Sequence, residues 1–253
     1  MAQHIILGNI GVLAIKIVIS AKKKKVLFLI NSLSIGGAEK VFVSQANALL
    51  DKDFEVYFGI LNNYIKDNYL CELKIARHNF INFNNMNFLD IKLYRKLYSF
   101  LASEHIGYIY ATLAPATIMA RVIKLFLPGV KVIVREACTA EIKALKQKIF
   151  DLITYPLIYR IIAVSELVRR SLEKYFFFHP QKIVVINNGI ELPPPPDRKK
   201  IAQIKKKYQL NGRYVVLHVG RMGKDTMGQK GHIYLIQASG RWPKQKSGWA
   251  TTK

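Results

Sequence analysis

The segment KVLFLINSLSIGGAEK, residues 25–40, indicates how the chain folds. Its first part, 25–30, is a continuous apolar run, the pattern of a strand buried on both faces of a parallel sheet. Two adjacent glycines, Gly36 and Gly37, follow, and apolar residues then recur at helical spacing, which predicts a helix over 38–50. The segment is therefore predicted to be a strand, a glycine turn and a helix, the beginning of a βαβ unit.

The same alternation of strand-like and helix-like segments continues along the chain. Further strands are predicted at 54–61, 79–85, 107–112, 130–136, 160–164 and 182–186, and further helices at 90–104, 114–127 and 140–158. Because strands separated by helix-length segments form parallel sheets, the predicted fold class is α/β, with a doubly wound, Rossmann-like parallel sheet.

Two helices carry more specific predictions. The inward side chains of the helix at 90–104 are predicted to be Ile91, Leu93, Tyr94, Leu97 and Leu101. Ser165 lies where the N-cap of the next helix is expected, and Glu166 follows in its first turn, near the positive end of the helix dipole.

The composition changes at ELPPPPDRKK, residues 191–200, where four consecutive prolines predict a stiff linker over 192–198. The predicted N-terminal domain is therefore 24–191. A basic helix from Asp197, a buried strand at 214–220 and a helix at 230–238 predict a second α/β domain that begins over 199–238 and is incomplete. The residues that follow, 239–253, have no periodicity and are predicted to be an irregular tail.

Residues 1–23 form an apolar and basic leader ahead of the first domain. A membrane anchor needs about 20 apolar residues, and this stretch is shorter and interrupted by Lys16. In a signal peptide the positive charge precedes the apolar run, whereas here the lysines follow it. Two interpretations stay open: a non-native leader, or a weak anchor whose lysines face the cytoplasm.

The charge of the chain is strongly positive. Its 39 Lys and Arg against 16 Asp and Glu give a net charge of +23, which predicts attraction to polyanions. Aromatic residues are not interleaved with basic ones as in single-strand binding proteins, so nucleic acid is a disfavoured partner. Cys71 and Cys138 lack the spacing of a metal or redox site and are predicted to be buried thiols in a reducing, cytoplasmic compartment.

Three places in the sequence could carry chemistry. Gly36 and Gly37 could expose backbone N–H groups to a phosphate at a helix N-terminus, although on the glycines alone a structural turn is favoured, since neither GxGxxG nor a P-loop is present. Arg221 follows a predicted strand and Lys230 begins the next helix, so the two could bind a diphosphate.

The third place is the pair Arg135 and Glu136, which ends a predicted strand. They could line an acceptor-binding cleft, because ligands of open α/β sheets bind at strand ends, or they could form an ordinary local ion pair. No Ser/His/Asp arrangement and no helical His-x-x-x-His is evident, so hydrolase and metalloenzyme functions lack support.

Four stretches in order, at 27–49, 161–172, 182–192 and 215–238, resemble the retaining glycosyltransferases of the GT-B fold, of the family 4 or group 1 type. The resemblance implies transfer of a sugar from a nucleotide diphosphate-sugar to a hydroxyl acceptor, often lipid-linked, in cell-surface polysaccharide, lipopolysaccharide or glycolipid synthesis. It implies that Gly36 and Gly37 form a loop at the inter-domain cleft, and that Arg221 and Lys230 hold the diphosphate of the donor. It implies no metal and no cofactor besides the donor, in a cytoplasmic protein that contacts the anionic membrane peripherally.

This sequence departs from the family pattern in three ways. Eight residues separate Arg221 from Lys230, more than is usual, so Lys224 competes for the phosphate role. The paired glutamates of the family have no counterpart, which predicts a truncated chain that lacks donor competence. The family's N-domain histidine is missing from 111–117. No catalytic residue is singled out, and the alternative function is a non-catalytic basic module that binds anionic membrane or nucleic acid.

Overall fold

The computed structural model describes residues 24–50, 52, 54–62, 69–87, 89–176, 179–189, 194–220 and 231–240. The chain divides into a first unit, Met1–Glu191, and a second unit, Leu192–Lys253, which are described separately below. The predicted leader at 1–23 lies outside the described residues.

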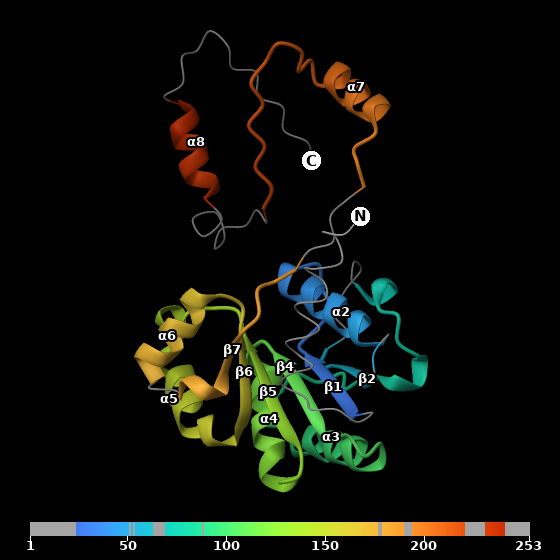
Figure 1. Ribbon diagram of the computed structural model, residues 1–253, viewed down its shortest axis with the longest axis vertical. Coiled ribbons are helices and arrows are strands. Elements are labelled where there is room, and N and C mark those ends of the chain that lie inside the picture. The colour runs from blue at the N-terminus through green and yellow to red at the C-terminus, as the bar shows by residue number, and fades with distance from the viewer. Residues whose placement is uncertain are drawn as a thin grey trace. The chain divides into compact units, whose positions relative to one another are not determined.

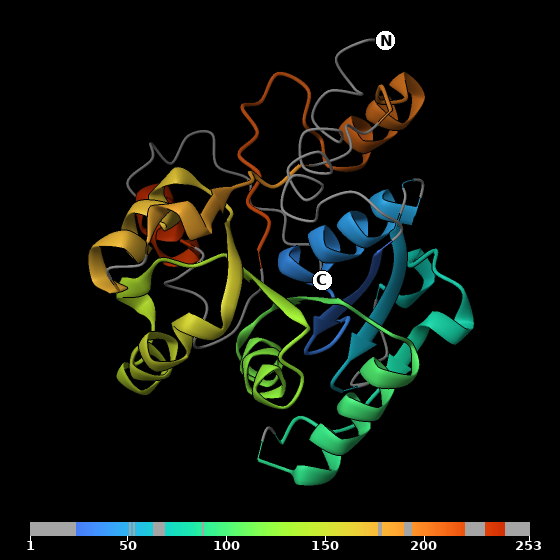
Figure 2. The same ribbon diagram turned by 60° about the horizontal axis from the view of Figure 1, so that its bottom comes forward.

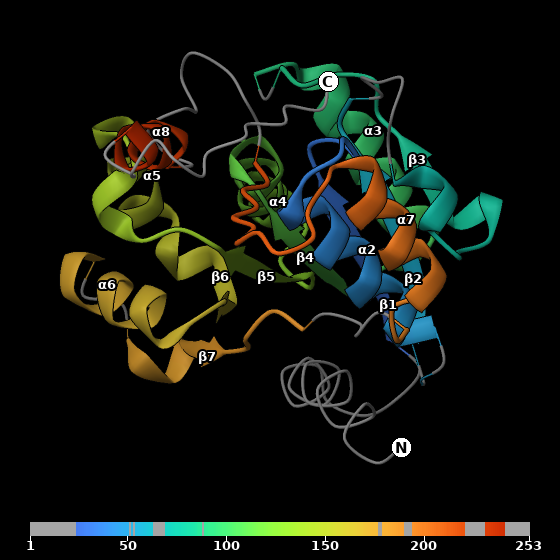
Figure 3. The ribbon, with the colours of Figure 1, turned by 90° about the horizontal axis from the view of Figure 1, so that it is seen from above.

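The described part of the first unit is built on a seven-stranded sheet in the order β3-β2-β1-β4-β5-β6-β7 (Figures 1 and 3). Every neighbouring pair is parallel. The strands are β1 (Lys24–Ile30), β2 (Phe54–Ile60), β3 (Phe80–Asn82), β4 (Tyr108–Thr112), β5 (Lys131–Glu136), β6 (Ile158–Ala163) and β7 (Ile183–Val185). The strand order changes direction between β1 and β4, so the predicted doubly wound parallel sheet is confirmed.

Helices connect the strands. The α-helices of the first unit are α2 (Gly37–Leu50), α3 (Ile91–Ser103), α4 (Ala114–Phe126), α5 (Leu145–Thr154) and α6 (Glu166–Phe176). Short 3-10 helices are η1 (Leu70–Glu72), η2 (Arg77–Asn79), η3 (Ala140–Ile142), η4 (Tyr155–Leu157) and η5 (Pro180–Lys182). The helix predicted as one segment at 140–158 is thus divided into η3, α5 and η4, and its last residue belongs to β6.

Two hydrophobic layers enclose the sheet. On one face, α2 packs on β1, β2 and β4, with Phe42, Val43, Ala46 and Leu49 buried (Figure 2). On the other face lie α3, α4 and α6. Val26 to Ile30 of β1 are fully buried, as a strand covered on both faces requires. The carboxyl ends of the strands are therefore held in place by helices on both sides.

The helix termini follow the local sequence. The Ser165 hydroxyl accepts from the backbone N–H of Val168 at 3.3 Å, and Glu166 lies in the first turn of α6, as predicted. Asp90 caps α3 by accepting from the backbone N–H of Lys92. Ile91 is then the first residue of α3 and is 69% exposed, so the prediction that it points inward is wrong.

Both cysteines are exposed, which corrects the prediction of buried thiols. Cys71 lies in the single turn of η1, and Cys138 lies in the loop that follows β5.

The second unit contains α7 (Arg198–Lys207), capped by the Asp197 carboxylate, and α8 (His232–Gly240). The basic helix is confirmed, and α8 extends into the start of the predicted irregular tail. Residues 214–220 form no strand and are exposed, Leu217 by 82%, so the predicted buried strand is wrong. A strand needs a neighbour to pair its backbone groups, and the described part of this unit offers none.

Candidate functional site

The carboxyl ends of the strands carry the polar side chains of the candidate site. Asn31 directly follows β1, and its side-chain oxygen accepts from the backbone N–H of Ala116 in the first turn of α4 at 3.1 Å. Its backbone oxygen accepts from the backbone N–H of Asn62, which follows β2, at 2.9 Å. Asn31 therefore joins three segments at the edge where ligands of doubly wound sheets bind.

The glycine turn leads from this edge into α2. The Gly36 carbonyl accepts from the backbone N–H of Lys40 at 3.0 Å and so closes the first helical turn. The Glu39 carboxylate folds back toward the turn, where the Ser34 hydroxyl donates to it at 3.5 Å. A Cβ atom on Gly36 would lie 2.2 Å from a Glu39 carboxylate oxygen, whereas one on Gly37 would meet nothing within 4 Å.

Gly36 thus makes room for an acidic side chain of the same helix. Glu39 is in the first turn of α2, where a negative charge is favoured by the helix dipole. This contact is a local, structural reason for the first glycine. The role of Gly36 and Gly37 beside a ligand stays a prediction.

We expect Gly36→Ala to leave the first unit about 1 kcal/mol less stable than Gly37→Ala, because only the first displaces the Glu39 carboxylate. Urea unfolding followed by circular dichroism measures both. In a Glu39→Ala background, the difference in stability between the two variants should disappear. Equal stabilities of the two alanine variants in the native background would contradict this account of the turn.

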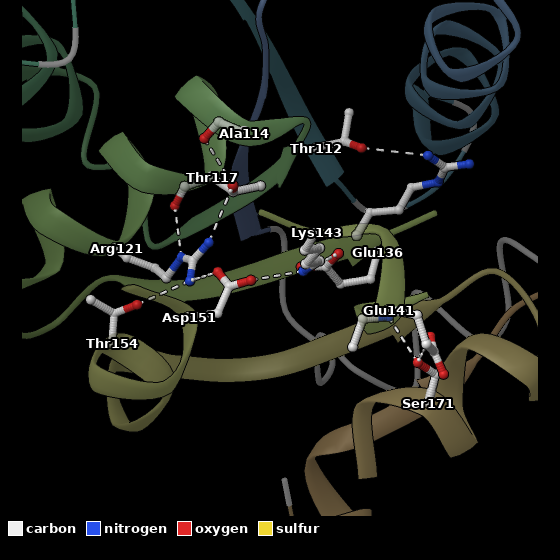
Figure 4. Close-up of polar contacts among 12 residues, drawn as sticks. Thr112, Ala114, Thr117, Arg121, Glu136, Glu141, Lys143, Asp151, Thr154 and Ser171 are labelled. Atoms are coloured by element: carbon white, nitrogen blue, oxygen red, sulfur yellow. Dashed lines mark hydrogen bonds and ion pairs between the residues drawn. The ribbon is translucent and has the colours of Figure 1, made fainter. Parts of the chain in front are cut away.

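Arg135, the predicted acceptor-side residue of β5, is only 3% exposed. Its guanidinium donates to the side-chain oxygen of Asn188 at 2.8 Å. It also donates to the Thr112 hydroxyl at 3.4 Å (Figure 4). Its Nε atom is buried and has no hydrogen-bond partner in the described structure. The guanidinium therefore joins the ends of β4 and β5 to the segment after β7 and keeps one donor unused.

Burial lowers the pKa of Arg135, and nearby groups, Glu136 and Glu39 among them, oppose this effect. The side chain nevertheless stays charged, because the pKa of arginine lies far above neutral pH. Among the described residues, no carboxylate is hydrogen-bonded to this buried positive charge.

Glu136 points to the other face of the sheet, where it joins a buried charge network of Arg121, Glu136, Lys143 and Asp151. The Lys143 ammonium lies 2.9 Å from Glu136 Oε2 and 2.8 Å from Asp151 Oδ2. Arg121 Nη1 lies 2.6 Å from Asp151 Oδ1 and also donates to the Thr154 hydroxyl at 2.9 Å (Figure 4). Two cations and two anions make the network neutral.

The pKa values within the network follow from burial and pairing. Burial raises the pKa of Glu136, and the Lys143 ammonium opposes that shift. Burial alone would lower the pKa of Lys143, but the two carboxylates outweigh it and raise the pKa. Lys143 thus stays protonated and connects β5 to α5.

The alternative of a local Arg135–Glu136 ion pair is wrong. Adjacent residues of a strand point to opposite faces of the sheet. Glu136 accordingly pairs with Lys143, while Arg135 bonds to Thr112 and Asn188. The prediction that the two residues line an acceptor-binding cleft is not tested by these contacts and stays a prediction.

The remaining predicted site residues, Arg221, Lys224 and Lys230, lie outside the described residues. The sequence did not single out Thr112, although a polar residue at the end of a buried strand is a usable signal. It could not single out Arg121 and Asp151 as a pair, because they are far apart in the chain and have no common spacing. Among the described residues, no group of three or more His, Cys, Asp or Glu side chains could hold a metal.

The model of glycosyltransferase family 4 matches residues 35–192, which is more than half of the chain and includes the glycine turn, Arg135 and Asn188. The chain belongs to glycosyltransferase family 4. The predicted resemblance to family 4 is thereby confirmed over these residues. No curated protein sequence matches this family 4 chain.

Solved structures share its fold. The structure of Anabaena HepE in complex with UDP and glucose matches with a TM-score of 0.70 at 19% identity, over 88% of this chain and 59% of that one. A glycosyltransferase from Rickettsia africae matches with a TM-score of 0.66 at 16% identity, over 90% and 60%.

The lipopolysaccharide outer core galactosyltransferase WaaB matches with a TM-score of 0.53 at 13% identity, over 69% and 49%. These identities show a common fold alone. The family 4 chain spans about 60% of the length of the first two structures.

No helix in the part of the chain that the structure describes has the length and apolar character needed to cross a bilayer.

Proposed function

We propose that this chain serves the transfer of a sugar from a nucleotide diphosphate-sugar to a hydroxyl acceptor. The family 4 match over 35–192 carries the proposal. HepE, whose structure contains UDP and glucose, supports a UDP-linked sugar as donor. WaaB, a lipopolysaccharide galactosyltransferase, supports a carbohydrate or lipid-linked acceptor of the cell surface.

The first unit, over 24–191, is proposed to bind the acceptor at the carboxyl ends of its strands. Sugar hydroxyls need both donors and acceptors of hydrogen bonds. Arg135 supplies a buried guanidinium with an unused donor, and Asn188 and Glu39 supply oxygens at the same edge. The glycine turn at Gly36 and Gly37 would let a substrate approach the backbone.

The second unit is proposed to bind the donor over 199–238. Arg221 and Lys230, with Lys224 as the competing cation, would hold the diphosphate, since guanidinium binds phosphate through paired donors. As the glycosidic bond breaks, their charge would stabilise the nucleoside diphosphate that leaves. The proposed reaction retains the anomeric configuration and needs neither a metal nor a further cofactor.

The proposed location is the cytoplasm, with peripheral contact to an anionic membrane face. The exposed lysines and arginine of α7 support the membrane contact. Each basic residue near an anionic surface contributes about 1 kcal/mol to binding.

We expect Arg221→Ala to weaken the binding of UDP-glucose by about 10- to 100-fold, because one charged contact to phosphate contributes about 1.5–3 kcal/mol. Isothermal titration calorimetry on the full chain measures the affinity. Arg213→Ala is the matched control, since it removes an exposed arginine from the same unit, and it should leave the affinity unchanged. Salt-sensitive binding of DNA or RNA without any response to UDP-glucose would instead favour a basic binding module.

A further inference from the structure

A second polar site lies at the amino ends of the strands, opposite the edge described above. There the loop after α4, the first residue of β5 and the first residues of β6 line an open surface hollow of about 350 Å³. We call it the basic hollow, after the four cationic side chains that line it: Lys124, Lys131, Arg160 and Lys182.

The positive charge of the basic hollow is not balanced. No Asp or Glu lines it, and none of its four cations forms an ion pair with a carboxylate of the described residues. The buried charge network, by contrast, pairs each cation with an acid. The basic hollow, unlike this network, therefore carries unbalanced positive charge.

Neutral groups hold the four cations in place. The Lys182 ammonium donates to the Ile158 carbonyl at 3.0 Å, and the Lys124 ammonium donates to the Pro128 carbonyl. Lys131 and Arg160 both lie 4.8 Å from the centre of the Tyr159 ring. Carbonyls and aromatic faces position a cation without cancelling its charge.

The like charges act on one another. Burial lowers the pKa of Lys182, and the neighbouring Arg160 lowers it further. A bound anion would relieve this repulsion and raise the pKa of Lys182.

We propose that the basic hollow binds a phosphate-bearing anion. Arginine recognises phosphate through two parallel donors and lysine acts as a point charge, so Arg160 with Lys131 and Lys182 suits a phosphate group. The volume suits a small phosphorylated group, such as a diphosphate or a phospholipid headgroup. This site is separate from the residues proposed to bind the donor and goes beyond the proposed sugar transfer.

The first test titrates the full chain with sodium pyrophosphate at low ionic strength and follows amide shifts in ¹H–¹⁵N spectra. The amides of Gly129, Ile158 and Arg160 should shift, and they should still shift in Arg221→Ala. Shifts that persist in Arg221→Ala distinguish binding at the basic hollow from binding at the proposed donor site. The proposal for the hollow and the proposed function can therefore fail independently. The proposal would be overturned if pyrophosphate shifted no amide of the hollow and the vesicle experiment described below also showed no binding.

The second test compares two doubly substituted chains of equal charge by calorimetry. The variant Lys131→Gln with Arg160→Gln should raise the dissociation constant of pyrophosphate at the hollow by about tenfold or more. The control Lys92→Gln with Lys146→Gln removes two exposed lysines elsewhere on the unit and should change it less than about twofold. Equal affinities of the two variants would overturn the proposal, and thermal unfolding checks that both are folded.

A third measurement distinguishes the two sources of phosphate. Sedimentation with phosphatidylcholine vesicles, with and without phosphatidic acid, reports binding to a lipid headgroup. If the lipid is the source, the wild-type and control chains should sediment only with phosphatidic acid, and the variant of the hollow should sediment with it clearly less than the control does. If a soluble phosphate is the source, pyrophosphate should bind and none of the three chains should sediment differently. Equal sedimentation of both variants without a pyrophosphate response would overturn the proposal.

Discussion

Replacing Asp151 with alanine is expected to lower the free energy of unfolding of the first unit by about 3–5 kcal/mol, because a broken buried ion pair leaves uncompensated charge. Asp151 is 2% exposed and lies at the centre of the buried charge network. It pairs with Arg121 at 2.6 Å and with Lys143 at 2.8 Å. Without it, Lys143 retains Glu136, whereas Arg121 keeps only neutral partners. Urea unfolding followed by circular dichroism measures the loss of stability.

The control removes an ion pair of the same kind from the surface. Glu173→Ala takes away a carboxylate that pairs with Arg169 on a partly exposed side of α6, and it should cost about 1 kcal/mol or less. Asp151→Asn should fall between the two, since the amide oxygen can still accept from Arg121. If Asp151→Ala cost no more than Glu173→Ala, the network would not be desolvated in the way that its burial indicates.

Phe42→Ala is expected to cost about 3–5 kcal/mol, the range for removing a buried aromatic side chain. Phe42 is fully buried and is the contact of α2 with the aromatic residues of the sheet. Its ring centre lies 5.0 Å from that of Phe28, 5.8 Å from that of Phe58 and 5.1 Å from that of Tyr110. Its loss would leave a cavity between the helix and three strands.

Phe126→Ala is the matched control, because it removes the same side chain from a position of α4 that is 63% exposed. Its effect should be within about 0.5 kcal/mol of zero. Near-ultraviolet circular dichroism, together with urea unfolding, measures both variants. If Phe42→Ala and Phe126→Ala were similarly stable, the contacts of Phe42 with Phe28, Phe58 and Tyr110 would not be what holds α2 on the sheet. Since α2 carries the glycine turn, the same variant should also alter any binding at that edge.

The order of strands and helices was predictable because hydrophobic periodicity is a local property of the chain. The apolar run at 25–30 indicated a strand covered on both faces, and Ser165 had the position of a cap. Residues 214–220 show where such reasoning fails. Their apolar pattern is that of a buried strand, but burial also needs neighbouring strands, which the described part of the second unit does not contain.

The candidate site was predictable only in part. Arg135 and Glu136 were found from their place at a strand end, and they indeed lie at the carboxyl edge of the sheet. Their partners were not foreseen, because Asn188 and Lys143 reach them from other elements of the fold. The basic hollow escaped notice for the same reason, since its cations come from separate segments between Lys124 and Lys182.

The sequence by itself determined the parallel α/β architecture, the glycine turn and the family, because each is written in residues that are neighbours along the chain. Only the tertiary structure decided that Arg135 bonds to Asn188, that Glu136 joins Lys143 and Asp151, and that unbalanced cations meet at the opposite edge. The physical reason is that a hydrogen bond or an ion pair depends on distance in space. That distance is set by how the strands and helices pack, and spacing along the chain does not reveal it.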